Sequence, residues 1–231
     1  MAQAPFRIVE VLFHDLTQLD FTGPHQVLSR LPGAEVIVAS EAGGPVEADG
    51  LTFANSVRLA EIEGCDLLLI PGGLGVHAAM EDPVFMDQIR RLGAGATYVT
   101  SVCTGSLILG AAGLLRGKRA ACHWGWRELL PLFGAIPDPG RVVRDGNTIT
   151  GGGVTAGIDL ALTIVAEVAG PEIAQSIQLL LEYAPAPPFN AGRPETAPPE
   201  ILAAVTKLMD AAAPERRASA ERAASQLMAE A

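Results

Sequence analysis

Cysteine and charged residues are scarce in this chain of 231 residues. Its three cysteines, Cys65, Cys103 and Cys122, form an odd count that argues against a disulfide framework and indicates a reducing compartment, so we expect a cytoplasmic protein. The net charge of -10 argues against a nucleic-acid surface, which would need a basic face. Charged residues make up 18% of the chain and apolar residues 49%, which predicts a large buried core rather than disorder.

Targeting and cofactor motifs are also missing. Residues 1–8 contain no charged segment followed by a long apolar core, so we expect no signal peptide. The stretch 93–115 has no ionisable acid or base besides Tyr98 and Cys103, but glycine, serine and threonine interrupt it. A strand running into a helix explains it better than a membrane span. Neither a GxGxxG motif nor a P-loop occurs, and no Cys/His cluster has metal-ligand spacing, so we expect no cofactor and no metal.

The order of the expected elements indicates an α/β fold. Apolar and β-branched runs predict strands at 6–13, 34–39, 66–70, 97–102 and 118–122. Helical patterns alternate with them at about 22–31, 82–92, 104–115, 124–133 and 156–169. Residues 141–150 are typical of a hairpin that turns at Gly146. The alternation predicts a doubly wound, mostly parallel sheet flanked by helices, as in flavodoxin-like folds.

The chain length suits a single domain of this class. We assign residues 1–200 to the α/β domain, including an extended proline-rich segment at 183–199. We assign residues 201–231 to a C-terminal helical extension of one or two surface helices, too short for an added DNA-binding domain.

Cys103 is the main candidate for chemistry. It lies between the expected strand 97–102 and the helix that follows, a tight turn that projects a side chain over the sheet edge. Backbone N–H groups and the helix dipole at such a turn favour a thiolate and a lowered cysteine pKa. Gly105 permits close backbone approach beside it. The alternative is an inert core cysteine, the usual state of a buried free thiol.

Three other groups could act at the same sheet edge. Asp20 is expected in the loop between the first strand and the first helix, where it could carry a proton or simply shape the turn. Gly73, in the glycine-rich turn after strand 66–70, could present its N–H to a developing anion. His123 could pair with Cys103, although a histidine beside Trp124 is more often packed structurally. The other cysteines are expected to be structural and the other histidines to lack a clear partner: Cys65, Cys122, His14, His25 and His77.

Five segments together resemble the class I glutamine-amidotransferase-like superfamily, which includes the PfpI proteases. They are 66–73 (DLLLIPGG), 102–106 (VCTGS), 112–117 (AGLLRG), 123–124 (HW) and 145–152 (DGNTITGG). Within that superfamily, three segments resemble the isocyanide (isonitrile) hydratases: 18–25 (QLDFTGPH), 100–106 (TSVCTGS) and 181–192 (LEYAPAPPFNAG). The last is the most discriminating, because a shared sheet motif would not demand it. The resemblance spans roughly residues 6–200.

This resemblance implies a homodimeric hydro-lyase that converts isocyanides and water to N-substituted formamides through a cysteine-bound thioimidate. It implies that Cys103 is the nucleophile and Asp20 its acid-base partner, in place of a Cys-His dyad. The backbone groups of Gly73, Thr104 and Val154 are then expected to contact the substrate or a charged intermediate. Two alternatives remain open: a glyoxalase-, deglycase- or hydrolase-type member of the superfamily, and a non-enzymatic redox sensor built on the same thiol.

Overall fold

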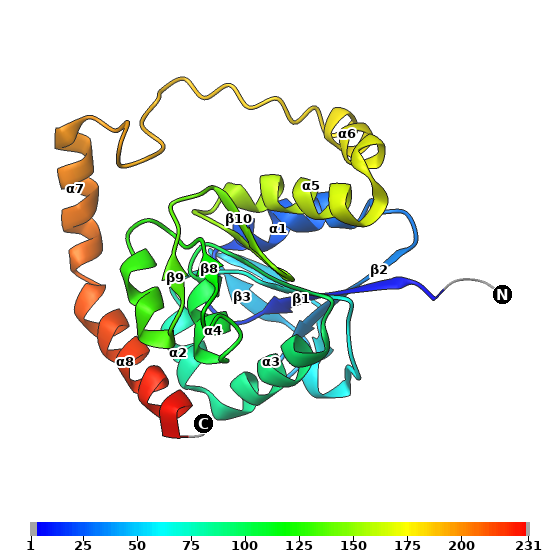
Figure 1. The fold of residues 1–231 in the computed structure, drawn as a ribbon, viewed down its shortest axis with the longest axis horizontal. Coiled ribbons are helices and arrows are strands. Elements are labelled where there is room, and N and C mark those ends of the chain that lie inside the picture. The colour runs from blue at the N-terminus through cyan, green and yellow to red at the C-terminus, as the bar shows by residue number, and fades with distance from the viewer. Residues whose placement is uncertain (1–3, 230–231) are drawn as a thin grey trace.

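A seven-stranded sheet forms the centre of the molecule (Figure 1). The computed structural model describes residues 4–229. In spatial order the strands are β10 (Val142–Asp145), β11 (Thr148–Gly151), β7 (Tyr98–Val102), β6 (Leu67–Ile70), β1 (Phe6–Leu12), β2 (Ala34–Ser40) and β5 (Val57–Arg58). Every neighbouring pair is parallel except β10 and β11, which form the expected hairpin. The prediction of a mostly parallel sheet flanked by helices is confirmed.

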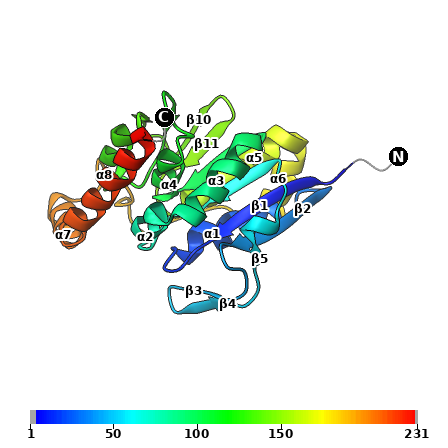
Figure 2. The ribbon, with the colours of Figure 1, turned by 90° about the horizontal axis from the view of Figure 1, so that it is seen from below.

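Helices cover both faces of this sheet (Figures 1 and 2). On one face lie α1 (Gln18–Leu28) and α5 (Ala156–Ala169), with α6 (Pro171–Leu180) packed on α5. On the other lie α2 (Val76–Glu81), α3 (Pro83–Gly95), α4 (Gly105–Ala111), the 3-10 helix η2 (Arg127–Phe133) and α8 (Ala213–Ala229). Successive strand residues alternate between the two cores: Val9 joins one apolar cluster and Ile8 the other. A sheet buried on both faces explains the continuous apolar run of β6.

Several short elements differ from the sequence prediction. Residues 118–122 do not form a strand of the main sheet: only β8 (Arg119–Ala120) is extended, and it pairs with β9 (Ile136–Pro137) in a separate small sheet. Cys122 therefore follows a strand instead of lying within one. The expected helix at 124–133 is the shorter η2, whose Pro131 supplies no N–H for an α-helical hydrogen bond.

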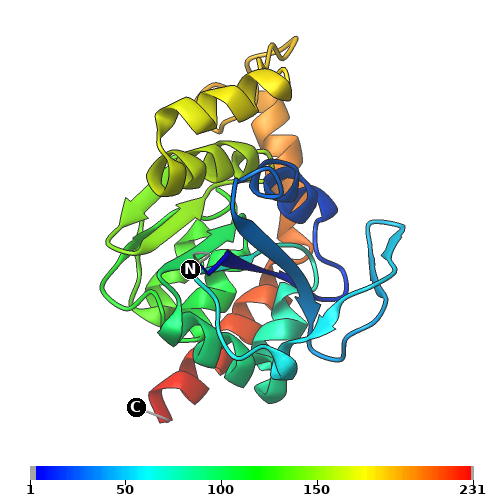
Figure 3. The ribbon, with the colours of Figure 1, turned by 90° about the vertical axis from the view of Figure 1, so that its right-hand side faces the viewer.

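Other short elements were not predicted at all. They are α2, α6, the 3-10 turn η1 (Leu59–Glu61) and the hairpin of β3 (Val46–Ala48) with β4 (Leu51–Phe53), which stands out from the body in Figure 3.

The first helix also differs from the prediction, and this change affects the site. Helix α1 begins at Gln18, four residues earlier than expected, so Asp20 lies in its first helical turn and not in a loop. A carboxylate is favoured there because the N-terminal end of a helix carries partial positive charge. Pro24, a residue typical of helix starts, lies inside this helix instead.

The sheet order defines one crevice. From β1 the chain passes through α1 to β2 on one side, whereas β6 joins β1 on the other side. Doubly wound sheets bind ligands at the carboxyl ends of the strands where the order reverses in this way. The ends of β1, β6 and β7 therefore meet where Asp20, Gly73 and Cys103 are found.

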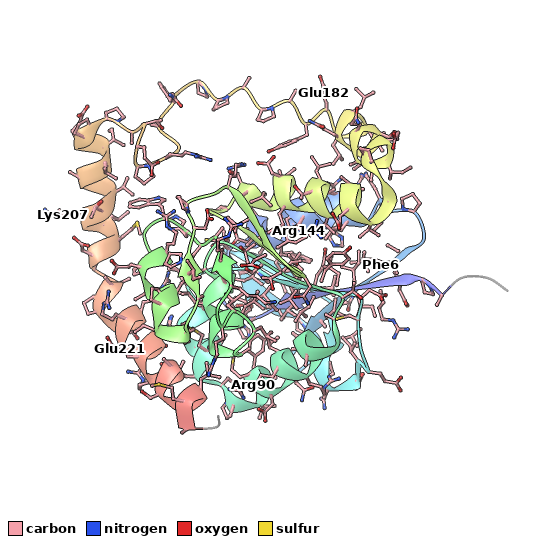
Figure 4. All side chains as sticks on the ribbon, viewed as in Figure 1. Phe6, Arg90, Arg144, Glu182, Lys207 and Glu221 are labelled. Atoms are coloured by element: carbon pink, nitrogen blue, oxygen red, sulfur yellow. The ribbon has the colours of Figure 1, made fainter. Side chains whose placement is uncertain are left out.

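The C-terminal part of the chain wraps the outside of the molecule. Residues 181–198 contain no helix or strand, and we call them the strap. Figure 1 shows the strap arching past α5 to reach α7 (Pro199–Asp210), which is followed by α8 against α2, α4 and η2. In Figure 4, Glu182 marks the start of the strap and Lys207 points outward from α7. Among residues 4–229, no helix combines the length and apolarity needed to cross a membrane.

Candidate active site

The strand–helix elbow at Cys103 is present and strained. Cys103 has a φ of +58°, a left-handed conformation that costs free energy for a residue with a side chain. Its N–H donates to the carbonyl oxygens of Gly152 (2.7 Å) and Gly151 (3.1 Å), which anchors the elbow to the end of β11. A Cβ on Gly105 would overlap the carbonyl oxygen of Ile70, so α4 can start this close to β6 only with glycine there.

Asp20 is fully buried beside the thiol. Its Oδ2 accepts a hydrogen bond from the Gly72 N–H at 2.9 Å. Within residues 4–229, Oδ1 has no hydrogen-bond partner, so the interaction between the carboxyl and the Cys103 thiol falls short of a well-formed hydrogen bond. Burial raises the pKa of Asp20 from 3.8 to about 7, against the lowering effects of the Gly72 N–H and of Cys103. Near neutral pH this carboxyl can therefore both accept and donate a proton.

Thr104 and the glycine turn after β6 interlock. The Gly73 N–H donates to Thr104 Oγ1 at 3.0 Å, and a Cβ on Gly72 would lie 2.5 Å from the Thr104 nitrogen. The Thr104 N–H opposes the rise in the pKa of the Cys103 thiol. The Thr104 amide thus favours a thiolate at Cys103, whereas the Gly73 N–H is already engaged by the threonine hydroxyl.

The pKa of Cys103 differs from the sequence prediction. Burial is the largest cause, and with the nearby Asp20 and Cys122 it raises the Cys103 pKa well above 9.0, despite the Thr104 N–H. A helix N-terminus does not offset the removal of a thiolate from water at a side chain that is only 5% exposed. The expectation of a lowered pKa is wrong for this state. The resting site pairs a protonated thiol with a buried carboxyl group whose pKa is about 7.

His123 and Val154 lie beside this centre. The His123 ring stacks on Trp124 at 5.7 Å, and among the described residues no hydrogen bond joins it to Cys103. Burial lowers the pKa of His123, as does Arg216. His123 and Val154 line a cavity of about 250 Å³ whose wall includes Gly152, the residue that binds the Cys103 N–H, and Arg193 of the strap. No group of three or more His, Cys, Asp or Glu residues within 4–229 could hold a metal ion.

Two features of the structure were missed by sequence reasoning. His25 has a partner: it lies 2.6 Å from the buried Glu10, whose position in the apolar run of β1 was a detectable signal of a buried charge. Arg216 of α8 reaches the Gly73 carbonyl and is only 5% exposed. Its sequence surroundings resemble a solvated helix, and only the small residues Ser219 and Ala220 hint at a buried face.

Comparisons with known proteins agree with this arrangement. A model of the DJ-1/PfpI family matches residues 6–167. The isonitrile hydratase of Pseudomonas putida is 49% identical over 218 residues, which cover 94% of this chain and 96% of that protein. The crystal structure of a THiJ/PfpI family protein from Pseudomonas syringae has a TM-score of 0.90 and 41% identity, covering 95% of this chain and 90% of that one. Drosophila melanogaster DJ-1beta has a TM-score of 0.70 and 27% identity, covering 78% of this chain and 100% of that one. The chain belongs to the DJ-1/PfpI family.

Proposed function

We propose that this protein hydrates isocyanides to N-substituted formamides, with Cys103 as nucleophile and Asp20 as acid-base group. The observation that carries the proposal is the pairing of a strained, buried thiol with a carboxyl group whose pKa is about 7. The near full-length similarity to an isonitrile hydratase supports the choice of substrate. The same pairing suits a reaction in which protons leave the thiol and water and are delivered to carbon, nitrogen and sulfur.

In the first half of the reaction, the thiol adds across the isocyanide carbon. Ionised Asp20 takes the proton from the Cys103 sulfur, and the sulfur attacks the terminal carbon. Protonated Asp20 then delivers this proton to the same carbon. The product is a thioimidate, R–N=CH–S–Cys103, and the carboxylate is regenerated.

In the second half, water is added and the sulfur leaves. Asp20 removes a proton from water as the oxygen attacks the thioimidate carbon and delivers it to the nitrogen, which gives R–NH–CH(OH)–S–Cys103. Asp20 then takes the hydroxyl proton and passes it to the sulfur as the carbon–sulfur bond breaks. This releases R–NH–CHO, returns Cys103 as a thiol and regenerates the carboxylate. The unpartnered Oδ1 of Asp20 is the oxygen free to serve both halves.

The backbone supports these steps unequally. The Thr104 N–H, which favours the ionised sulfur, stabilises the thiolate as it attacks and as it leaves. The Gly73 N–H can contact the substrate only if it releases Thr104 Oγ1. Val154 contributes to the wall of the adjacent cavity.

We also propose a homodimer in the cytoplasm. Four large apolar side chains on α6, the strap and α7 are 72–81% exposed, and a second copy of the chain would cover them: Leu179, Leu180, Phe189 and Leu208. Light scattering should give a mass twice the chain mass of 24.0 kDa. Phe189→Asp should lower the measured mass, whereas Val84→Asp, at an exposed position on α3, should leave it unchanged. A monomeric wild type would reject the dimer. The three free cysteines support a reducing compartment.

Turnover of an aromatic isocyanide tests the proposed activity. Formamide formation is followed by absorbance for the wild type, Cys103→Ala and Asp20→Asn. We expect both variants to lose activity by at least about a hundredfold, because each lacks a group used in both halves. Full activity in Cys103→Ala would remove the mechanism, and full activity in Asp20→Asn would reject only the choice of acid-base group.

A further inference from the structure

A buried arginine enters the site from the last helix. Arg216 of α8 is 5% exposed, and its guanidinium lies 4.2 Å from the centre of the Trp126 ring. Its Nη2 donates to the Gly73 carbonyl oxygen at 3.5 Å. Among residues 4–229, no carboxylate forms an ion pair with it. Removing a cation from water without a paired anion costs free energy, which an aromatic ring and a carbonyl oxygen offset only in part. Such a residue is therefore a candidate for a role at a neighbouring group.

The contacts of Arg216 lead directly to the elbow. The Gly73 carbonyl oxygen that accepts from Arg216 also lies 3.4 Å from Thr104 Oγ1, and the Gly73 N–H donates to that same hydroxyl. Thr104 directly follows Cys103 in the chain, and its N–H lowers the pKa of the Cys103 thiol. Arg216 therefore holds the peptide group against which Thr104 is fixed.

Arg216 also places a buried positive charge close to the elbow. The ionisable groups that affect Cys103 are Asp20 from α1 and Cys122 after β8, and both disfavour its thiolate. Burial lowers the pKa of Arg216, and the neighbouring Cys103 and Cys122 oppose this effect. Arg216 in turn lowers the pKa of Cys122. A buried positive charge this close to the elbow attracts a thiolate at Cys103 in the same way. His123 is also affected by Arg216: burial lowers its pKa, and the guanidinium acts in the same direction, which disfavours a second positive charge there.

We propose that Arg216 is a positioning residue for the reaction at Cys103: it fixes the Gly73–Thr104 pair and supplies the positive charge that favours the thiolate. The inference rests on the proposed function only in naming Cys103 as the nucleophile. Residue 216 lies beyond the 6–167 span matched by the family model, and all of DJ-1beta is matched by 78% of this chain. Arg216 thus reaches the site from outside the part of the chain that the family model matches.

The thiolate fraction of Cys103 provides a test that needs no isocyanide. The rate of alkylation by iodoacetamide is measured against pH, with Cys103 resolved from the other two cysteines by peptide mass spectrometry. Arg216→Gln retains a donor for the Gly73 carbonyl but removes the charge, whereas Arg216→Lys retains the charge. The matched control is Arg222→Gln, on the same helix, whose guanidinium pairs with Glu81.

We expect Arg216→Gln to raise the alkylation midpoint by about one pH unit, which slows alkylation about tenfold at a fixed pH below the midpoint. Arg216→Lys should restore most of this loss, and Arg222→Gln should leave the midpoint unchanged. Trp126→Leu, which removes the ring beneath the guanidinium, should raise the midpoint in the same direction and serves if Arg216→Gln does not fold.

Two results would overturn the proposal. One is an unchanged midpoint in the folded Arg216 and Trp126 variants. The other is an equal shift in Arg222→Gln, which would trace the effect to the docking of α8. A wild type without turnover on isocyanides, but with the expected shift in Arg216→Gln, would reject the hydratase activity and leave the role of the charge in place.

Discussion

Replacing Asp20 with asparagine tests the burial of this carboxyl group through protein stability. The side chain is fully buried, and its pKa rises from 3.8 to about 7. The folded state therefore binds the proton more tightly than the unfolded state does. The stability that this group contributes is present below about pH 4 and is lost as the pH rises toward 7. A shift of about three units corresponds to about 4 kcal/mol once both states are ionised.

Asparagine has the same shape but no charge, and its carbonyl oxygen can accept the Gly72 N–H. The unfolding free energy of Asp20→Asn, relative to wild type, should therefore rise by about 2–3 kcal/mol between about pH 5 and pH 8. Urea denaturation followed by tryptophan fluorescence, at one protein concentration, measures it. Asp87→Asn, at a carboxylate 71% exposed on α3, should show no such change. A difference that stays constant or falls across this pH range would refute the reasoning.

Three further substitutions test packing and pairing. Gly105→Ala places a methyl group against the carbonyl oxygen of Ile70, and we expect it to lower the unfolding free energy by at least about 2 kcal/mol. A urea midpoint equal to that of the wild type would contradict the close approach of α4 to the end of β6. His25→Ala leaves the buried Glu10 without its partner and should lower the unfolding free energy by about 1–3 kcal/mol at neutral pH. The loss should be smaller in acid, where Glu10 is protonated, and equal losses at both pH values would argue against an ionised pair. Tyr183→Phe removes the 2.9 Å hydrogen bond that the strap donates to Asp159. It should increase the rate of proteolytic cleavage within the strap and leave the melting temperature unchanged. Cleavage at the wild-type rate would show that this hydrogen bond does not hold the strap in place.

The fold was largely predictable because local patterns and the sheet rules agree. The apolar run of β6 and the β-branched run of β7 are unambiguous, and alternating helices then dictate parallel pairing. Short elements were missed where local preference is weak. The β3–β4 hairpin has only three residues in each strand. The strand expected at 118–122 is shorter and lies outside the main sheet, because Arg119–Ala120 pairs with β9, a partner that the local sequence pattern does not reveal.

At the site, the sequence indicated which residues meet but not their protonation. The glycine turns and the elbow predict that Cys103, Thr104 and Gly73 share one sheet edge, and they do. The pKa of Cys103 depends on how completely water is excluded, which is a property of the whole packed molecule. Arg216 could not be assigned for the same reason, since its contacts join residues about 140 positions apart.

The placement of α8 has a consequence for synthesis of the chain. Helix α8 is translated after every strand of the sheet and after the strap, yet its side chains bind His77 and Gly73, which emerge more than 140 residues earlier. On the ribosome, the elbow can form before the guanidinium that lies beside it has been made. The Cys103 sulfur is therefore surrounded by its complete set of neighbours only when the chain has been translated through α8.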